Sequence, residues 1–253
     1  MGKVLSSYKG QIVAFDSEGF MTDHRWVQIG GLAGLVYVIA NVVAESIVGS
    51  MPNQNASVAT ITSFVNAHRH ALVVSSIILV ASFALVLWFL GTVHHALRRN
   101  DDSHDSLTSV VVASGVSAAV LGALSGGPMA VLAMMAGQPG GLSGSTVRAL
   151  FDMQAVIGGL SFMLLFGFVF SLGVAFVHRG ILGSWFLALT LVDAAIVALA
   201  SGVSLAIGNN SAMITFTFVG LIGFGIVVIC TSVAMISKTI EEPSMATLAG
   251  HAA

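Results

Sequence analysis

Charged residues are scarce in this sequence. Of its 253 residues, 9 are Lys or Arg and 11 are Asp or Glu, which together make up 8% of the chain. Soluble domains carry roughly 25% charged residues, so the composition excludes a soluble globular domain and indicates a membrane protein. The formal net charge of −2 and the dispersed basic residues also argue against nucleic-acid binding. The partner that this composition indicates is the lipid bilayer.

Cysteine is nearly absent, since Cys230 is the only one in the chain. A disulfide within the chain is therefore excluded, and so is a metal cluster built from several thiolates. The sequence also lacks the HExxH spacing of many zinc hydrolases, a phosphate-binding glycine loop and the GxSxG sequence of serine hydrolases. No motif for a known reaction is left, and a role other than catalysis is favoured.

Long apolar runs are abundant. About 20 apolar residues form a helix long enough to cross the ~30 Å hydrocarbon core of a bilayer. Six such runs, joined mostly by short connections, cover residues 26 to 49, 71 to 97, 107 to 136, 149 to 177, 181 to 207 and 213 to 237. The sequence therefore predicts an all-α fold, a polytopic transmembrane helix bundle with six spans that forms one domain over residues 26 to 237.

Basic residues near the ends of the runs predict the orientation, because Lys and Arg are retained preferentially on the cytoplasmic side. With the N-terminus inside, the cytoplasmic set is Lys3, Lys9, Arg25, Arg98, Arg99, Arg179 and Lys238, and the outer set is only Arg69 and Arg148. We therefore expect a multi-pass protein of a bacterial plasma membrane with both termini in the cytoplasm.

The two ends of the chain form cytoplasmic segments in this prediction, residues 1 to 25 and residues 238 to 253. The first segment is too polar and too broken to be a signal peptide. Met21 is an alternative natural start to Met1, so we expect residues 1 to 20 to be poorly ordered.

Small residues and one proline predict how the spans pack. We expect Gly30 and Gly34, Gly122 and Gly126, and Gly159 with Ser161 to let helices approach closely. The sequence GGP, which ends at Pro128, is expected to interrupt and kink the third span. Apolar residues at helical spacing between residues 50 and 67 predict a short amphipathic helix on the outer surface.

Two short matches suggest an internal repeat. IGGLAG at 29 to 34 returns as IGGLSF at 157 to 162, and a His-Arg pair precedes both the second and the fifth span. Three spans per half would make a 3+3 inverted repeat, as in some transporters. Chance matches within a sequence of low complexity are the alternative.

Polar residues inside the runs are the candidates for a functional site, because ionisable groups within a membrane usually face a bundle interior or a wet cavity. The candidates for a ligand or proton pathway are Asn41, Glu45, His70, Asp152, Gln154 and Asp193. All except Asp193 fall in the outer part of the membrane. We expect them to line an outward-facing pocket that has Asp193 as its floor.

Each carboxylate also has a structural interpretation. Glu45 can form an ion pair with Arg69 or His70, because a buried charge without a partner is poorly tolerated. Asp152 can stabilise the start of the fourth span by interacting with free amides there. Asp193, near the middle of the fifth span, can stay protonated and bond to a hydroxyl group.

Metal and haem sites are weaker alternatives, and no cofactor is predicted. A zinc site needs about three protein ligands, which Glu45, His70 and Asp152 could supply. A haem site needs two histidines at similar depth on different helices, and His95 and His178 near the cytoplasmic boundary are the candidates.

One stretch, RALFDMQAVIGGLSFMLLFGFVFSLGVAFVHRGILGSWFLALTLVDAAI at 148 to 196, resembles bacterial six-span proteins of domain-of-unknown-function family 4386. A first span with GLAGLVYVIA at 31 to 40 is similar to the GLxYL-like first span of that family. The resemblance covers about a third of the chain and implies a six-span bundle. It implies no chemistry, because the family has no assigned reaction.

These features predict an integral membrane protein that binds or transports a small polar or lipid-like ligand. Two other functions stay open. One is a non-catalytic accessory subunit of a larger membrane complex, with a membrane-protein partner or a second copy of the chain. The other is a membrane-embedded metal-dependent enzyme that uses the same outer residues.

Overall fold

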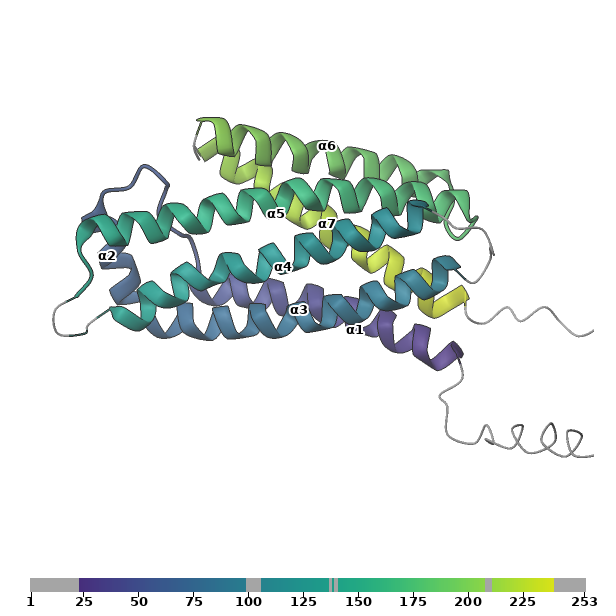
Figure 1. Cartoon of the computed structure of the whole chain (residues 1–253), viewed down its shortest axis with the longest axis horizontal. Coiled ribbons are helices and arrows are strands. Elements are labelled where there is room, and N and C mark those ends of the chain that lie inside the picture. The colour runs from purple at the N-terminus through teal and green to yellow at the C-terminus, as the bar shows by residue number, and fades with distance from the viewer. Residues whose placement is uncertain (1–22, 99–105, 137, 139–140, 208–210, 239–253) are drawn as a thin grey trace, which may run out of the picture.

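The computed structural model describes residues 23 to 98, 106 to 136, 138, 141 to 207 and 211 to 238. This described part of the chain forms seven α-helices and contains no strand (Figure 1). The helices are α1 Asp23–Val48, α2 Val58–Ala67, α3 Arg69–Arg98, α4 Ser106–Met135, α5 Gly144–His178, α6 Ser184–Ile207 and α7 Ser211–Lys238. All except α2 are long and apolar enough to cross a membrane. The prediction of an all-α fold with six spans is confirmed, and the chain is a multi-pass integral membrane protein.

The six long helices follow one another around a ring. α3 packs on α1, each of α4 to α7 packs on the helix before it, and α7 packs back on α1. The start of α1 and the end of α7 lie at one end of the bundle, which we call the terminal end (Figure 1). α2 lies at the opposite end, which we call the capped end. In the predicted orientation the capped end faces outward.

The orientation, the type of membrane and the 3+3 inverted repeat stay predictions. The predicted cytoplasmic segments, residues 1 to 25 and 238 to 253, lie almost wholly outside the described residues, as does the alternative start at Met21.

Glycines allow close contact between neighbouring helices. A Cβ atom at Gly30 of α1 would collide with the Thr92 side chain of α3, and Cβ atoms at Gly34 and Gly122 would also collide with neighbouring side chains. The predicted packing roles of these three glycines are confirmed. The prediction for Gly126 is wrong, because no atom that the structure describes lies within 4 Å of a Cβ placed there.

Gly30→Ala is expected to destabilise the bundle by about 1–3 kcal/mol, because the added methyl group overlaps Thr92 and forces the helices apart. Thermal unfolding of the detergent-solubilised protein measures this loss. Thr92→Ala in the same chain removes the overlapping Oγ1 and Cγ2 atoms but keeps the Cβ atom, which also overlaps, so it should restore only part of the stability. Gly91→Ala is the control, since a Cβ there meets no described atom within 4 Å. Equal losses in the two single glycine variants would contradict the overlap as the cause.

α2 covers the capped end of the bundle. Ser57 begins the helix, and its hydroxyl oxygen accepts a hydrogen bond from the Thr60 N–H at 3.2 Å, which satisfies one of the free amides of the first turn. Ile61 and Val65 are buried in an apolar cluster with residues of α3, α4 and α5. The predicted amphipathic helix is therefore confirmed, but its apolar face packs on the ends of other helices and not on lipid.

α4 runs without interruption through Pro128. The predicted interruption of the third span is therefore wrong, and the predicted kink stays a prediction. Proline removes one backbone hydrogen bond, but membrane helices tolerate this loss where neighbouring groups compensate for it. Pro128 itself is buried against protein.

Candidate functional site

A cavity of about 180 Å³ lies inside the ring of helices. It is lined by residues of α1, α3, α4, α5 and α7, and none of the described side chains of α6 lines it. Its polar lining residues are Tyr37, Asn41, Glu45, Ser125 and Ser161, and the rest of the wall is glycine, aliphatic or aromatic. Because pockets for drug-sized ligands have volumes of about 300–1,000 Å³, this cavity fits a smaller molecule.

α1 provides most of the polar wall. Tyr37, Asn41 and Glu45 are spaced four residues apart, so they lie on one face of the helix. Tyr37 is buried, Asn41 is half-buried and Glu45 is exposed. The wall thus becomes more open toward the capped end of α1, and Glu45 lies at the mouth of the cavity.

Asn41 connects this polar wall to α3. Its amide nitrogen donates hydrogen bonds to the Tyr37 carbonyl oxygen at 2.9 Å and to the Ser82 hydroxyl oxygen at 3.3 Å. The Ser82 hydroxyl donates in turn to the Leu79 carbonyl oxygen at 2.7 Å. These contacts hold the polar face of α1 toward the cavity.

The Glu45 carboxylate makes no ion pair or hydrogen bond with the residues that the structure describes. The predicted pair with Arg69 or His70 is therefore wrong. Arg69 donates instead to the carbonyl oxygens of Ala133 and Met134, at 3.0 and 3.4 Å. These carbonyls belong to the last turn of α4, which lacks helical donors of its own.

Aromatic side chains form the deeper part of the wall. The ring centroid of Tyr37 lies 6.1 Å from that of Phe83 and 6.3 Å from that of Phe224. The rings of Phe168 and Phe224 follow at 6.4 Å, and all four residues line the cavity. Aromatic faces attract cations as well as apolar groups, so this part of the wall can accept either.

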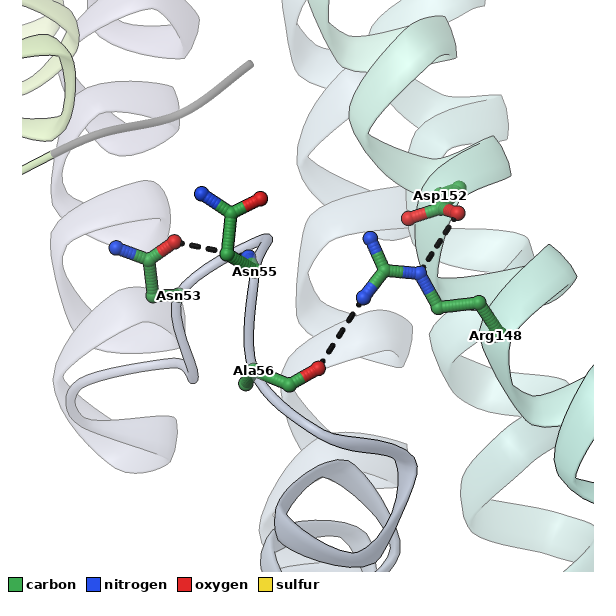
Figure 2. Close-up of polar contacts among 5 residues, drawn as sticks. All are labelled: Asn53, Asn55, Ala56, Arg148 and Asp152. Carbon is green, nitrogen blue, oxygen red and sulfur yellow. Dashed lines mark hydrogen bonds and ion pairs between the residues drawn. The ribbon is translucent and has the colours of Figure 1, made fainter.

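Asp152, another candidate, belongs to the capped end and not to the cavity lining. Arg148 Nε donates to its carboxylate at 2.9 Å, and Arg148 Nη1 donates to the Ala56 carbonyl oxygen at 3.1 Å (Figure 2). Arg148 thereby fastens the segment before α2 to α5. The interpretation of Asp152 as part of a helix start is wrong, because α5 begins two turns earlier, after Ser143.

Three further candidates are also absent from the lining. His70 is exposed in the first turn of α3, and the amide nitrogen of Gln154 lies 3.8 Å from the Met51 sulfur. Asp193 is buried on α6, against Gly223 of α7. The structure thus brings Asn41 and Glu45 together in one cavity and places the other four candidates elsewhere.

The metal and haem sites stay weaker predictions. Within the described residues, no group of three or more His, Cys, Asp or Glu side chains is arranged to hold a metal ion. Among the haem candidates, His178 is exposed in the last turn of α5. His95 has a buried Nε2 atom that finds no hydrogen-bond partner in the described part of the chain.

The sequence did not predict that these serine and phenylalanine residues line a cavity. Each lies in an apolar run where lipid-facing and cavity-facing positions have similar composition. Ser161 connects α5 to α4, because its hydroxyl donates a hydrogen bond to the Ala118 carbonyl oxygen at 2.8 Å. A serine in an apolar span predicts a helix contact, but it does not predict which helix is contacted.

Comparison of the chain with models of protein families, with curated proteins and with solved structures found no match. The resemblance to domain-of-unknown-function family 4386 accordingly stays a prediction that rests on residues 31 to 40 and 148 to 196.

Proposed function

We propose that this membrane protein binds a small amphipathic organic cation in the cavity inside the helix ring. The observation that carries the proposal is the position of Glu45, a carboxylate without a described partner, at the mouth of a cavity whose deeper wall is aromatic. The positive group of the ligand lies beside Glu45, and its apolar part lies among Tyr37, Phe83 and Phe224.

Charge favours a cation over an anion in this cavity. Glu45 is the only charged residue among those that line it in the described structure. Two opposite unit charges 4 Å apart attract by about 4 kcal/mol at an effective dielectric constant of about 20. This attraction offsets the loss of water around the cation, whereas an anion would be repelled.

Two ligands of the same shape test this proposal. Benzyltrimethylammonium carries a quaternary nitrogen where neopentylbenzene carries a quaternary carbon. Binding to the purified full-length chain in lipid nanodiscs is measured by equilibrium dialysis, with protein-free nanodiscs as the control for partition into lipid. We expect the cation to bind about tenfold more tightly or better, a difference of about 1.4 kcal/mol. Equal affinities, or no binding of the cation above the control, would overturn the proposal.

Transport is a further step of the same proposal. A binding cavity serves transport only if it also opens toward the terminal end of the bundle. Uptake of radiolabelled benzyltrimethylammonium into proteoliposomes, compared with protein-free liposomes, separates the two functions. Accumulation that depends on the protein would identify a transporter, and binding without uptake would identify a binding protein.

A further inference from the structure

A second polar site lies between α6 and α7, outside the cavity. Asp193 is only 3% exposed, and neither of its carboxylate oxygens has a hydrogen-bond partner within the described chain. A Cβ atom at Gly223 would collide with Asp193 Oδ1 and would lie 2.8 Å from its Cγ. The carboxyl group therefore packs directly on the backbone of α7, where glycine leaves room for it.

The hydroxyl group nearest along α6 is already engaged. Thr190 precedes Asp193 by about one helical turn, but its hydroxyl donates to the carbonyl oxygens of Phe186 and Leu187 at 3.1 and 3.0 Å. The sequence-based expectation that Asp193 bonds to a hydroxyl is therefore wrong for the described residues.

No charged group in the described parts of α5 and α7 lies level with Asp193. α6 packs on α5 and α7. The titratable residues of these two helices are Arg148, Asp152, His178, Cys230 and Lys238. Four of them lie toward the helix ends. The fifth, Cys230, lies about 10 Å along α7 from Gly223. An ionised Asp193 would thus have no counter-charge in this packing.

A proton is the ligand that suits this carboxyl group. Burying an ionised carboxylate without a partner costs several kcal/mol, and protonation removes that cost. Metal cations such as Ca²⁺ take about six or more oxygen ligands, whereas the described site supplies only the two oxygens of one side chain. A proton needs only one of them.

We propose that Asp193 is a proton-binding site inside the membrane. It holds a proton while α6 and α7 are packed together, and it releases the proton only when α7 moves away from α6 and water reaches the carboxylate. This inference does not depend on the proposed binding of an organic cation.

α7 connects the proton site to the cavity. Gly223 contacts Asp193, and the next residue, Phe224, lines the cavity and packs edge-on against Tyr37 and Phe168. Movement of α7 away from α6 therefore shifts one wall of the cavity. Proton release and the shape of the cavity are coupled through this helix.

Infrared difference spectroscopy of the full-length protein in lipid tests proton binding. At pH 7 an aspartate in water is ionised, because its pKa is about 3.9, and it lacks the carbonyl band of a protonated acid. We expect this band in the wild type, its loss in Asp193→Asn, and its retention in Asp152→Asn. Asp193→Ser provides a second neutral variant should the first fail to fold. If neither Asp193 variant changes the infrared spectrum in the region of this carbonyl band, the proposal is overturned.

The separation of α6 and α7 tests proton release. Spin labels are attached through Val192→Cys and Ile222→Cys, two positions exposed on these helices, in a chain that also carries Cys230→Ser. Their separation should increase as the pH is raised until the Asp193 band disappears, and Asp193→Asn should show no increase. Loss of the band at constant separation would overturn the release step, as would an equal increase in the Asp193→Asn chain.

Discussion

Glu45→Gln is expected to weaken the binding of benzyltrimethylammonium about tenfold or more, which corresponds to about 1.4 kcal/mol or more of binding free energy. The substitution keeps the length and polarity of the side chain. It removes the only charge among the residues that line the described cavity. Equilibrium dialysis of the variant in lipid nanodiscs measures the loss, and the affinity for neopentylbenzene should stay within about twofold because that ligand has no charge to lose.

Asp152→Asn is the matched control for this prediction. It also neutralises a single carboxylate near the capped end, but that carboxylate is bound to Arg148 and lies outside the cavity lining. We expect the control to keep the wild-type affinity for the cation. An equal loss in both variants would mean that the overall charge of the capped end attracts the ligand and that the cavity does not hold it.

Ala119→Leu should reduce binding of the cation about 100-fold or more, a loss of about 2.7 kcal/mol. Ala119 is buried in the wall of the cavity, and the larger side chain occupies space that the ligand needs. Filling a void does not remove packing contacts, so the melting temperature should not fall. Binding and thermal unfolding are measured on the same preparation.

Ala113→Leu serves as the control for cavity filling. Ala113 lies on the same helix, α4, but it is exposed and does not line the cavity. The control should bind the cation as the wild type does. Full binding by a folded Ala119→Leu chain would place the ligand somewhere other than this cavity.

Local sequence features predicted the helices and part of the site. Uninterrupted apolar runs fix where membrane helices form, because every backbone group must be satisfied within the helix in lipid. The four-residue spacing of Asn41 and Glu45 put them on one helix face, and the structure places both in the cavity wall. The i,i+4 pair of Arg148 and Asp152 could have been found by the same spacing.

Contacts between distant segments could not be predicted in this way. Whether Asp193 faces the cavity or a neighbouring helix depends on the rotation of α6, and lipid-facing and protein-facing residues of a span are equally apolar. The close approach of Gly223 to its carboxyl group therefore gave no sequence signal. The same holds for Arg69, whose partners are two backbone carbonyls that any sequence would supply.

Anomalous X-ray scattering from 4-bromobenzyltrimethylammonium, bound in crystals of the full-length protein, tests the cavity as the ligand site most directly. We predict one bromine peak inside the helix ring, between Glu45 and the aromatic side chains around Phe224, and its loss in Glu45→Gln crystals at the same ligand concentration. A bromine peak confined to the lipid-facing surface of the ring, or no peak at a saturating concentration, would contradict binding of an organic cation in this cavity.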